Sequence, residues 1–137
     1  ADPELDMPQQ IRAVALVPGT GEYSLATSKV YVSRSPGVIN AENTRTKSGK
    51  TDLQTSLASL RRAMPSYRST SLVVSWFGTD LRCSACKLQP RVERFSADGI
   101  DMPWSVSGTD RENAVRVPYD DADRPIYGGT PTDASVK

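Results

Sequence analysis

The feature that most constrains the fold is a capped helix pattern that lies between two apolar runs. Thr51-Asp-Leu-Gln54 is a capping box, in which a hydroxyl and a glutamine three residues later satisfy free amides at a helix start. The apolar residues that follow fall on one helical stripe: Leu53, Leu57, Leu60 and Met64. Pro65 ends the pattern, which therefore predicts a helix over residues 52–64.

The two flanking runs predict parallel strands. Ile11–Pro18 and Ser71–Phe77 are apolar, have the length of strands, and end at Gly-Thr pairs. The second run has no polar alternation in its centre, which predicts a strand buried on both faces, as in parallel sheets. The order strand, helix, strand predicts a right-handed βαβ unit, with parallel strands near 11–18 and 71–77. The predicted fold class is α/β.

Long polar segments follow each predicted strand. Residues 23–50 contain a hairpin signal, because Lys29–Val32 alternates and Ser35-Pro-Gly37 predicts a turn before Val38 and Ile39. Residues 78–118 contain further short extended pieces. Both segments are predicted to be β-rich loop insertions that decorate one face of the unit.

The last residues predict the beginning of another helix. Thr130 is a candidate N-cap, Pro131 suits the first helical position, and Asp133 completes a capping box. Only four residues remain before Lys137, so we expect the chain to be a piece of a longer protein.

Composition narrows the function further. The chain has 137 residues, a net charge of +1 and 37% hydrophobic residues, which fits one domain over 11–137 behind a polar leader at 1–10. The chain lacks the excess of basic residues that is typical of nucleic-acid-binding proteins. No apolar run approaches the roughly 20 residues that span a bilayer. The leader lacks the pattern of a signal peptide.

The sequence contains no histidine. Its absence excludes a Ser-His-Asp triad, a Cys-His dyad and any His-ligated metal site within this chain.

Candidate site residues follow the ends of the predicted strands. Glu22 and Asp80 can form the carboxylate pair of a glycoside hydrolase, or they can cap turns and pair with Arg82 or Lys29. The candidate sugar contacts are Trp76, Arg82 and Trp104. For each tryptophan, packing in the core is the alternative.

Two short motifs carry weaker signals. Cys83-Ser-Ala-Cys86 has redox-motif spacing but no helix pattern behind it, so a local disulfide or two packed thiols is the favoured interpretation. The alternative is that the two cysteines are half of a zinc site whose other ligands lie outside this sequence. No complete metal site is predicted within the chain. Gly19-Thr-Gly21 matches neither a dinucleotide fingerprint nor a P-loop, and no cofactor is predicted.

Several of these motifs, taken in order, resemble one family. They are Val17–Glu22, Ser71–Gly78, Asp80–Cys83 with Cys86, Pro103-Trp104, and Pro125–Ser135. Together they are similar to the start of the glycoside-hydrolase-like TIM-barrel domain of the large tail-tip (baseplate hub) protein of gene transfer agents and related tailed phages.

The resemblance implies both a fold and a role. The fold would be the N-terminal part of a (β/α)8 barrel that continues beyond Lys137. The role would be a structural, cell-envelope-contacting module of a tail-tip hub. Its partners would be other tail-tip or baseplate proteins and a cell-surface glycan, in a particle made in the bacterial cytoplasm. The alternative is a TIM-barrel glycoside hydrolase acting on cell-wall or capsule polysaccharide. The resemblance assigns no catalytic residue.

Overall fold

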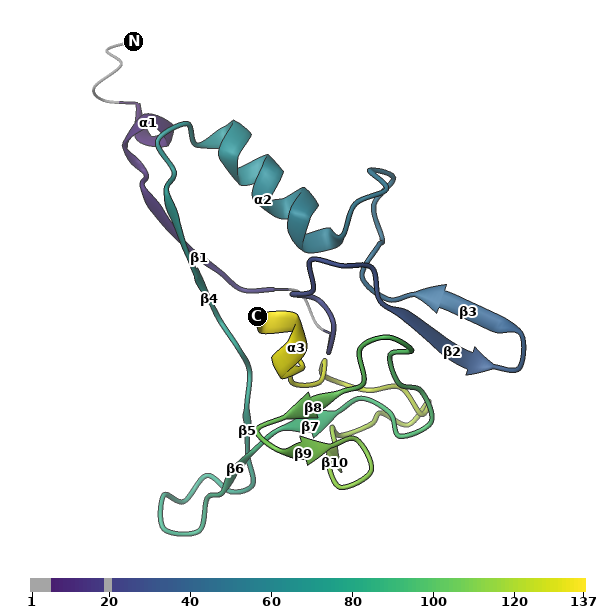
Figure 1. Cartoon of the computed structure of the whole chain (residues 1–137). Helices are drawn as coiled ribbons and strands as arrows, with labels where there is room; N and C mark the ends of the chain where they lie inside the picture. Colours follow the sequence, from purple (N-terminus) through teal and green to yellow (C-terminus); the bar gives the residue numbers. More distant parts are fainter. Residues whose placement is uncertain (1–5, 19–20) are drawn as a thin grey trace.

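A computed structural model describes residues 6–18 and 21–137, so that Gly19 and Thr20 of the predicted turn lie outside the described residues. Figure 1 shows the arrangement of the elements. In chain order they are α1 (Met7–Gln10), β1 (Ala13–Leu16), β2 (Tyr31–Ser35), β3 (Val38–Ala41), α2 (Asp52–Ala63), β4 (Ser69–Leu72), β5 (Phe77–Gly78), β6 (Leu88–Gln89), β7 (Arg91–Val92), β8 (Ser105–Val106), β9 (Thr109–Asp110), β10 (Val115–Arg116) and α3 (Asp133–Val136).

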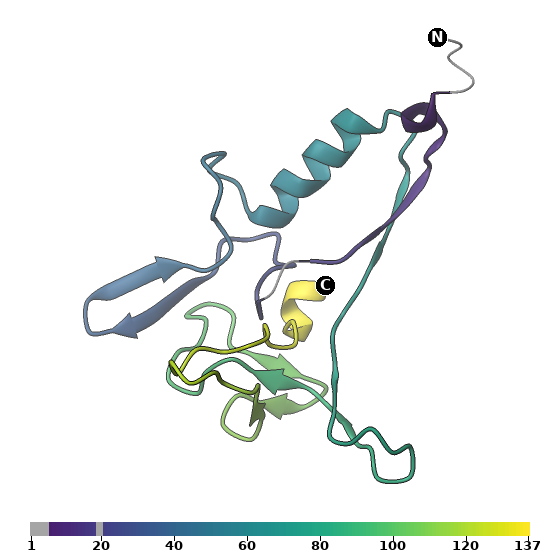
Figure 2. The same cartoon turned by 180° about the vertical axis from the view of Figure 1, so that it is seen from behind.

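The predicted strand, helix, strand unit is present. β1 and β4 are parallel, with Ala13 opposite Ser69 and Leu16 opposite Leu72. α2 connects them and lies beside the ribbon that they form (Figures 1 and 2). The capping box forms as predicted, because Thr51 Oγ1 accepts from the Gln54 amide and Gln54 Oε1 accepts from the Thr51 amide, both at 3.3 Å.

The prediction of a TIM-like barrel is wrong. The described strands form five separate two-stranded sheets, and no barrel closes. β1 and β4 pair only with each other, and the chain then turns into the short antiparallel pairs β5–β6 and β8–β9 and the parallel pair β7–β10. The chain therefore folds as a small mixed α/β protein, and the predicted loop insertions supply most of its strands.

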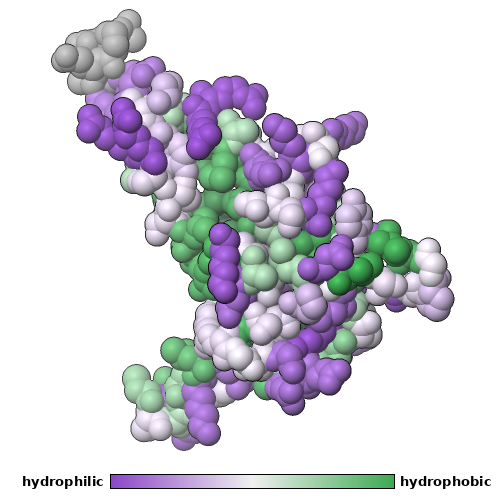
Figure 3. Space-filling model, viewed as in Figure 1, coloured by the Kyte–Doolittle hydropathy of each residue, from purple (hydrophilic) through white to green (hydrophobic). Residues whose placement is uncertain are grey.

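The predicted burial of the second strand is also wrong. β4 ends at Leu72, and Val73 and Val74, which continue its apolar run, are 41% and 37% exposed. A groove of about 630 Å³, lined in part by Leu16 and Leu60, separates α2 from β1. Figure 3 shows an apolar band in the region of the molecule where β1 and β4 lie.

The core lies in the segments that were predicted to be decoration. Residues 23–32 contribute Tyr23, Ala26, Val30 and Val32, and the segment after β6 contributes Val92, Trp104, Val106 and Ala114. Within α2, by contrast, Leu53 is the buried residue. The parts of the chain with the weakest apolar periodicity therefore pack most tightly.

Two hairpins project from this core (Figures 1 and 2). The predicted hairpin forms as β2–β3, and Gly37 occupies its turn with a φ of 79°. β5–β6 carries the loop 79–87 away from the opposite side of the molecule. In the part of the chain that the structure describes, no helix is long and apolar enough to cross a membrane.

Candidate functional site

A buried ion pair between Glu22 and Arg111 joins the two parts of the core. Glu22 lies in the turn region after β1, Arg111 follows β9, and the two side chains are only 6% and 5% exposed. Arg111 Nη2 donates to Glu22 Oε2 at 2.5 Å, and Nη1 donates to Oε1 at 3.2 Å. The Glu93 amide also donates to Glu22 Oε1, at 2.6 Å. The carboxylate thus accepts three hydrogen bonds, which compensate its burial.

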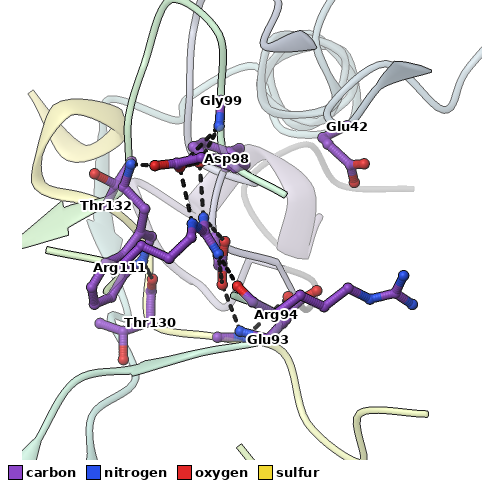
Figure 4. Close-up of polar contacts among 12 residues, drawn as sticks. Glu42, Glu93, Arg94, Asp98, Gly99, Arg111, Thr130 and Thr132 are labelled. Atoms are coloured by element: carbon purple, nitrogen blue, oxygen red, sulfur yellow. Dashed lines mark hydrogen bonds and ion pairs between the residues drawn. The ribbon is translucent and has the colours of Figure 1, made fainter. Parts of the chain in front are cut away.

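The other contacts of Arg111 extend this pair into a network (Figure 4). Its Nη2 donates to Tyr23 Oη at 3.0 Å, and its Nη1 donates to the Arg94 carbonyl at 2.6 Å. Its Nε lies 3.0 Å from Asp98 Oδ1 but has no hydrogen-bond partner, so this contact is an ion pair without hydrogen-bond alignment. Tyr23 Oη donates to Asp98 Oδ1 at 2.7 Å and accepts from the Gly99 amide at 2.9 Å. The guanidinium therefore contacts four residues and connects residues 22–23 with residues 94–98.

The protonation states follow from burial and from these bonds. Burial raises the pKa of Glu22, although the hydrogen bond and charge of Arg111 oppose the rise. Burial also raises the pKa of Tyr23, so the phenol keeps its proton at neutral pH. For Asp98, burial alone would raise the pKa, but hydrogen bonds from Tyr23 and the Trp104 amide outweigh it and leave the pKa below its ordinary value.

A second set of hydrogen bonds fixes the C-terminal segment to the core. Thr130 and Thr132 are both fully buried. The Thr130 carbonyl accepts a hydrogen bond from Trp104 Nε1 at 2.7 Å. The side-chain Oγ1 of Thr130 accepts a hydrogen bond from the Arg91 amide at 3.1 Å. Thr132 Oγ1 exchanges hydrogen bonds with the backbone of Ser105, at 3.0 and 3.1 Å. The residues predicted to open a helix therefore act mainly as buried anchors, and Thr132, not Thr130, is the N-cap residue of α3.

Asp80 has a different environment from Glu22. It lies at the β5–β6 hairpin, where its Oδ1 accepts from the amide and Nε of Arg82 at 2.8 and 3.0 Å. Arg82 Nη2 lies 2.8 Å from Asp80 Oδ2, and this hydrogen bonding lowers the pKa of Asp80. Glu22 contacts neither Arg82 nor Lys29 but Arg111, so each candidate acid is bound to an arginine of its own.

The remaining predicted site residues are spread over the molecule. Trp76 is 42% exposed, whereas Trp104 is 1% exposed and packs in the core, which was the alternative considered for it. Cys83 is exposed, Cys86 is half-buried, and both are free thiols. Among residues 6–18 and 21–137, no three Cys, Asp or Glu side chains gather to hold a metal ion.

The sequence signals did not indicate three members of the network. Arg111 lies in a polar stretch with no periodicity, and Asp98 precedes a glycine, a pair that is typical of an ordinary turn. Tyr23 directly follows the one member that was identified, Glu22. A buried charge has no local sequence signature, because its partner comes from a segment far away in the chain.

A small cavity borders the network. It has a volume of about 70 Å³, which is room for roughly five water molecules. Its lining includes the network residues Glu22, Tyr23 and Arg111, and the β2–β3 hairpin contributes Val32, Arg34 and the following Glu42. The other lining residues include Glu93, Ala97 and the exposed Arg45 and Arg94. The site is therefore rigid at its inner side and rich in charge at its opening.

Gly129 is a position where a side chain would disturb the ion pair. A Cβ there would lie 2.7 Å from Glu22 Cγ and 3.0 Å from the Arg91 carbonyl oxygen. Because that backbone oxygen cannot move cheaply, we expect Gly129→Ala to lower the free energy of unfolding by about 1–3 kcal/mol in urea denaturation.

Gly78→Ala is the matched control for this substitution. The nearest atom to its added Cβ is Cys86 Sγ at 2.9 Å, the end of a side chain that can rotate away. We expect a loss of about 0.5 kcal/mol or less. Equal losses in the two variants would contradict the close packing of Gly129 against Glu22.

Comparison of the sequence with models of known protein families gave no match, and no curated protein matches it. A function for this chain rests instead on two grounds, the arrangement of its side chains and the resemblance of its motifs. The arrangement offers a rigid core, two projecting hairpins and one charged cavity.

Proposed function

We propose that the chain is a structural, cell-envelope-contacting module of a phage-like tail-tip hub protein, with a surface glycan as its contact. The observation that carries this choice is the pairing of both candidate acids with arginines. A glycoside hydrolase needs two carboxyl groups that face one glycosidic bond, one as acid and one as nucleophile or base. Glu22 faces Arg111 in the interior and Asp80 holds Arg82 at the surface, which favours contact over hydrolysis.

The β5–β6 hairpin is the contact element of this proposal. Trp76 precedes it with 42% of its surface exposed, and its indole ring offers an apolar face to a sugar ring. In the hairpin loop, Leu81 is fully exposed and the Arg82 side chain is 78% exposed. Trp76 and Arg82 therefore remain candidate sugar contacts, whereas the burial of Trp104 makes it a support of the core.

The tail-tip assignment rests on the motif resemblance and has a direct test. The expected partners are other tail-tip or baseplate proteins, in a particle made in the bacterial cytoplasm. Antibodies raised against this chain should label the tail tips of phage-like particles in negative-stain electron microscopy. Particles that carry the label elsewhere, or tails that carry none, would overturn the assignment.

Envelope contact is tested with the purified chain and isolated bacterial envelopes. We expect saturable binding and no release of reducing ends from the polysaccharide. Trp76→Ala should weaken the binding by roughly tenfold, since the loss of one aromatic contact costs about 1–2 kcal/mol. The matched control is Tyr31→Ala, which removes an aromatic side chain of equal exposure (41%) from β2.

Two outcomes would overturn the contact function. Release of reducing ends by the native chain, abolished in Glu22→Gln, would show that the chain hydrolyses polysaccharide. Equal loss of envelope binding in Trp76→Ala and Tyr31→Ala would show that binding does not depend on the β5–β6 side of the molecule.

A further inference from the structure

The cavity beside the Glu22–Arg111 pair contains an imbalance of charge. Four arginines line it, Arg34, Arg45, Arg94 and Arg111, together with three glutamates, Glu22, Glu42 and Glu93. Arg111 is paired with Glu22, and Arg34 Nη2 lies 2.6 Å from Glu42 Oε1. Glu93 Oε1 accepts from the Gly129 amide at 3.0 Å. In the described part of the chain, the guanidinium groups of Arg45 and Arg94 have no ion-pair or hydrogen-bond partner.

The backbones that carry these two arginines are nevertheless fixed. The Arg45 amide donates to Asp52 Oδ1 at 2.9 Å, which attaches it to the first turn of α2. The Arg94 carbonyl accepts from Arg111 Nη1 at 2.6 Å, which attaches it to the buried network. In Figure 4 the Arg94 side chain extends away from the Arg111–Asp98 contacts. Two unpaired cations are thus held at one cavity by a rigid frame.

The chemistry of the lining defines a class of ligand. A guanidinium group binds a carboxylate or a phosphate through two parallel hydrogen bonds. With Glu22 and Glu42 paired, Glu93 is the one carboxylate among the lining residues that has no arginine partner, and its Oε1 accepts from the Gly129 amide. Two unpaired arginines against one such glutamate leave an excess of positive charge in the lining.

We propose that this cavity, with Arg45 and Arg94 at its opening, is a subsite for the acidic group of a surface sugar. The volume of about 70 Å³ admits one carboxylate or phosphate group, and the sugar that carries it lies across the opening. The assignment of a sugar rests on the proposed envelope-contacting function. The anionic chemistry rests on the cavity itself.

The test measures binding of a uronic-acid oligosaccharide, tetragalacturonate, to the whole chain by isothermal titration calorimetry at fixed ionic strength. We expect saturable binding that inorganic phosphate competes away, and no binding of a neutral glucose tetramer. Arg45→Ala with Arg94→Ala should weaken tetragalacturonate binding by roughly tenfold or more, because two charge-assisted contacts are lost. The thermal melting temperature of this variant should stay near that of the native chain, since both side chains are exposed and unpaired.

The matched control removes the same charge elsewhere. Arg61 and Arg62 are exposed in the last turn of α2, and Arg61→Ala with Arg62→Ala should leave binding within about twofold. Equal weakening in both double variants would overturn the subsite, because binding would then follow net charge alone. Binding of the neutral tetramer with the same affinity, or binding of phosphate without tetragalacturonate, would overturn the assignment of an acidic sugar.

The two proposals fail in different measurements. A chain that adheres to envelopes but does not bind tetragalacturonate overturns the subsite and leaves the envelope contact intact. A chain that binds tetragalacturonate through Arg45 and Arg94 but does not adhere to any envelope overturns the contact function and supports the subsite.

Discussion

Arg111→Met is expected to lower the free energy of unfolding by about 3–5 kcal/mol, because it leaves the Glu22 carboxylate buried without its cation. A loss of this size is a large share of the stability of a small domain. The substitution also removes the hydrogen bonds that Arg111 donates to Tyr23 Oη and to the Arg94 carbonyl. Chemical denaturation followed by circular dichroism measures the change.

The same variant should show a characteristic dependence on pH. Without Arg111, the pKa of the buried Glu22 rises further, so that the folded state binds a proton more readily than the unfolded state. The stability deficit relative to the native chain should therefore narrow as the pH falls through that raised pKa. A deficit that is constant with pH would show that charge burial is not its cause.

The companion substitution separates charge from packing. The double variant Glu22→Gln with Arg111→Met contains no unpaired carboxylate at this position and should recover much of the lost stability. Glu22→Gln alone should cost less than Arg111→Met, since Arg111 keeps its ion pair with Asp98. A double variant as unstable as Arg111→Met would contradict the assignment of the loss to the Glu22 charge.

Trp104→Ala is expected to cost about 3–5 kcal/mol through the cavity that it leaves in the core. It also leaves the buried Thr130 carbonyl without the indole donor. Trp104→Phe should cost less, because it retains most of the ring volume and loses mainly that hydrogen bond. The midpoint of denaturant unfolding reports both losses.

Trp76→Ala is the internal control for this experiment. Trp76 is 42% exposed and lies outside the core cluster, so we expect a change of about 0.5 kcal/mol or less. Comparable losses at the two tryptophans would contradict the assignment of Trp104 to the core and of Trp76 to the surface.

The elements that the sequence predicts correctly are local. The capping box at Thr51, the helix that follows it and the turn at Gly37 each depend on residues within a few positions of one another. The parallel pairing of β1 with β4 followed from the connecting helix. These features need no knowledge of the rest of the chain.

The location of the core and the number of paired strands depend on contacts that no local pattern encodes. The run from Ser71 to Phe77 is apolar enough for a buried strand, yet the structure pairs only its two ends, with β1 and with β6, and leaves Val73 and Val74 exposed. The sequence did not indicate the polar network at Arg111 for the same reason, since its members come from three separate parts of the chain, residues 22–23, 94–98 and 111. The barrel implied by the resemblance was wrong because it assigned the core to the strand-helix-strand unit rather than to the segments that follow it.

The 89 residues that separate Glu22 from Arg111 also determine the order in which the chain acquires its structure. The capping box and the hydrogen bonds within α2 join residues a few positions apart, so these contacts close only short loops. The ion pair must first close a long loop, and its entropic cost is repaid only when residues 92–132 have been synthesised. Consolidation of the core therefore depends on closing a long loop, in which Glu22 loses its hydration only when Arg111 is in place to pair with it.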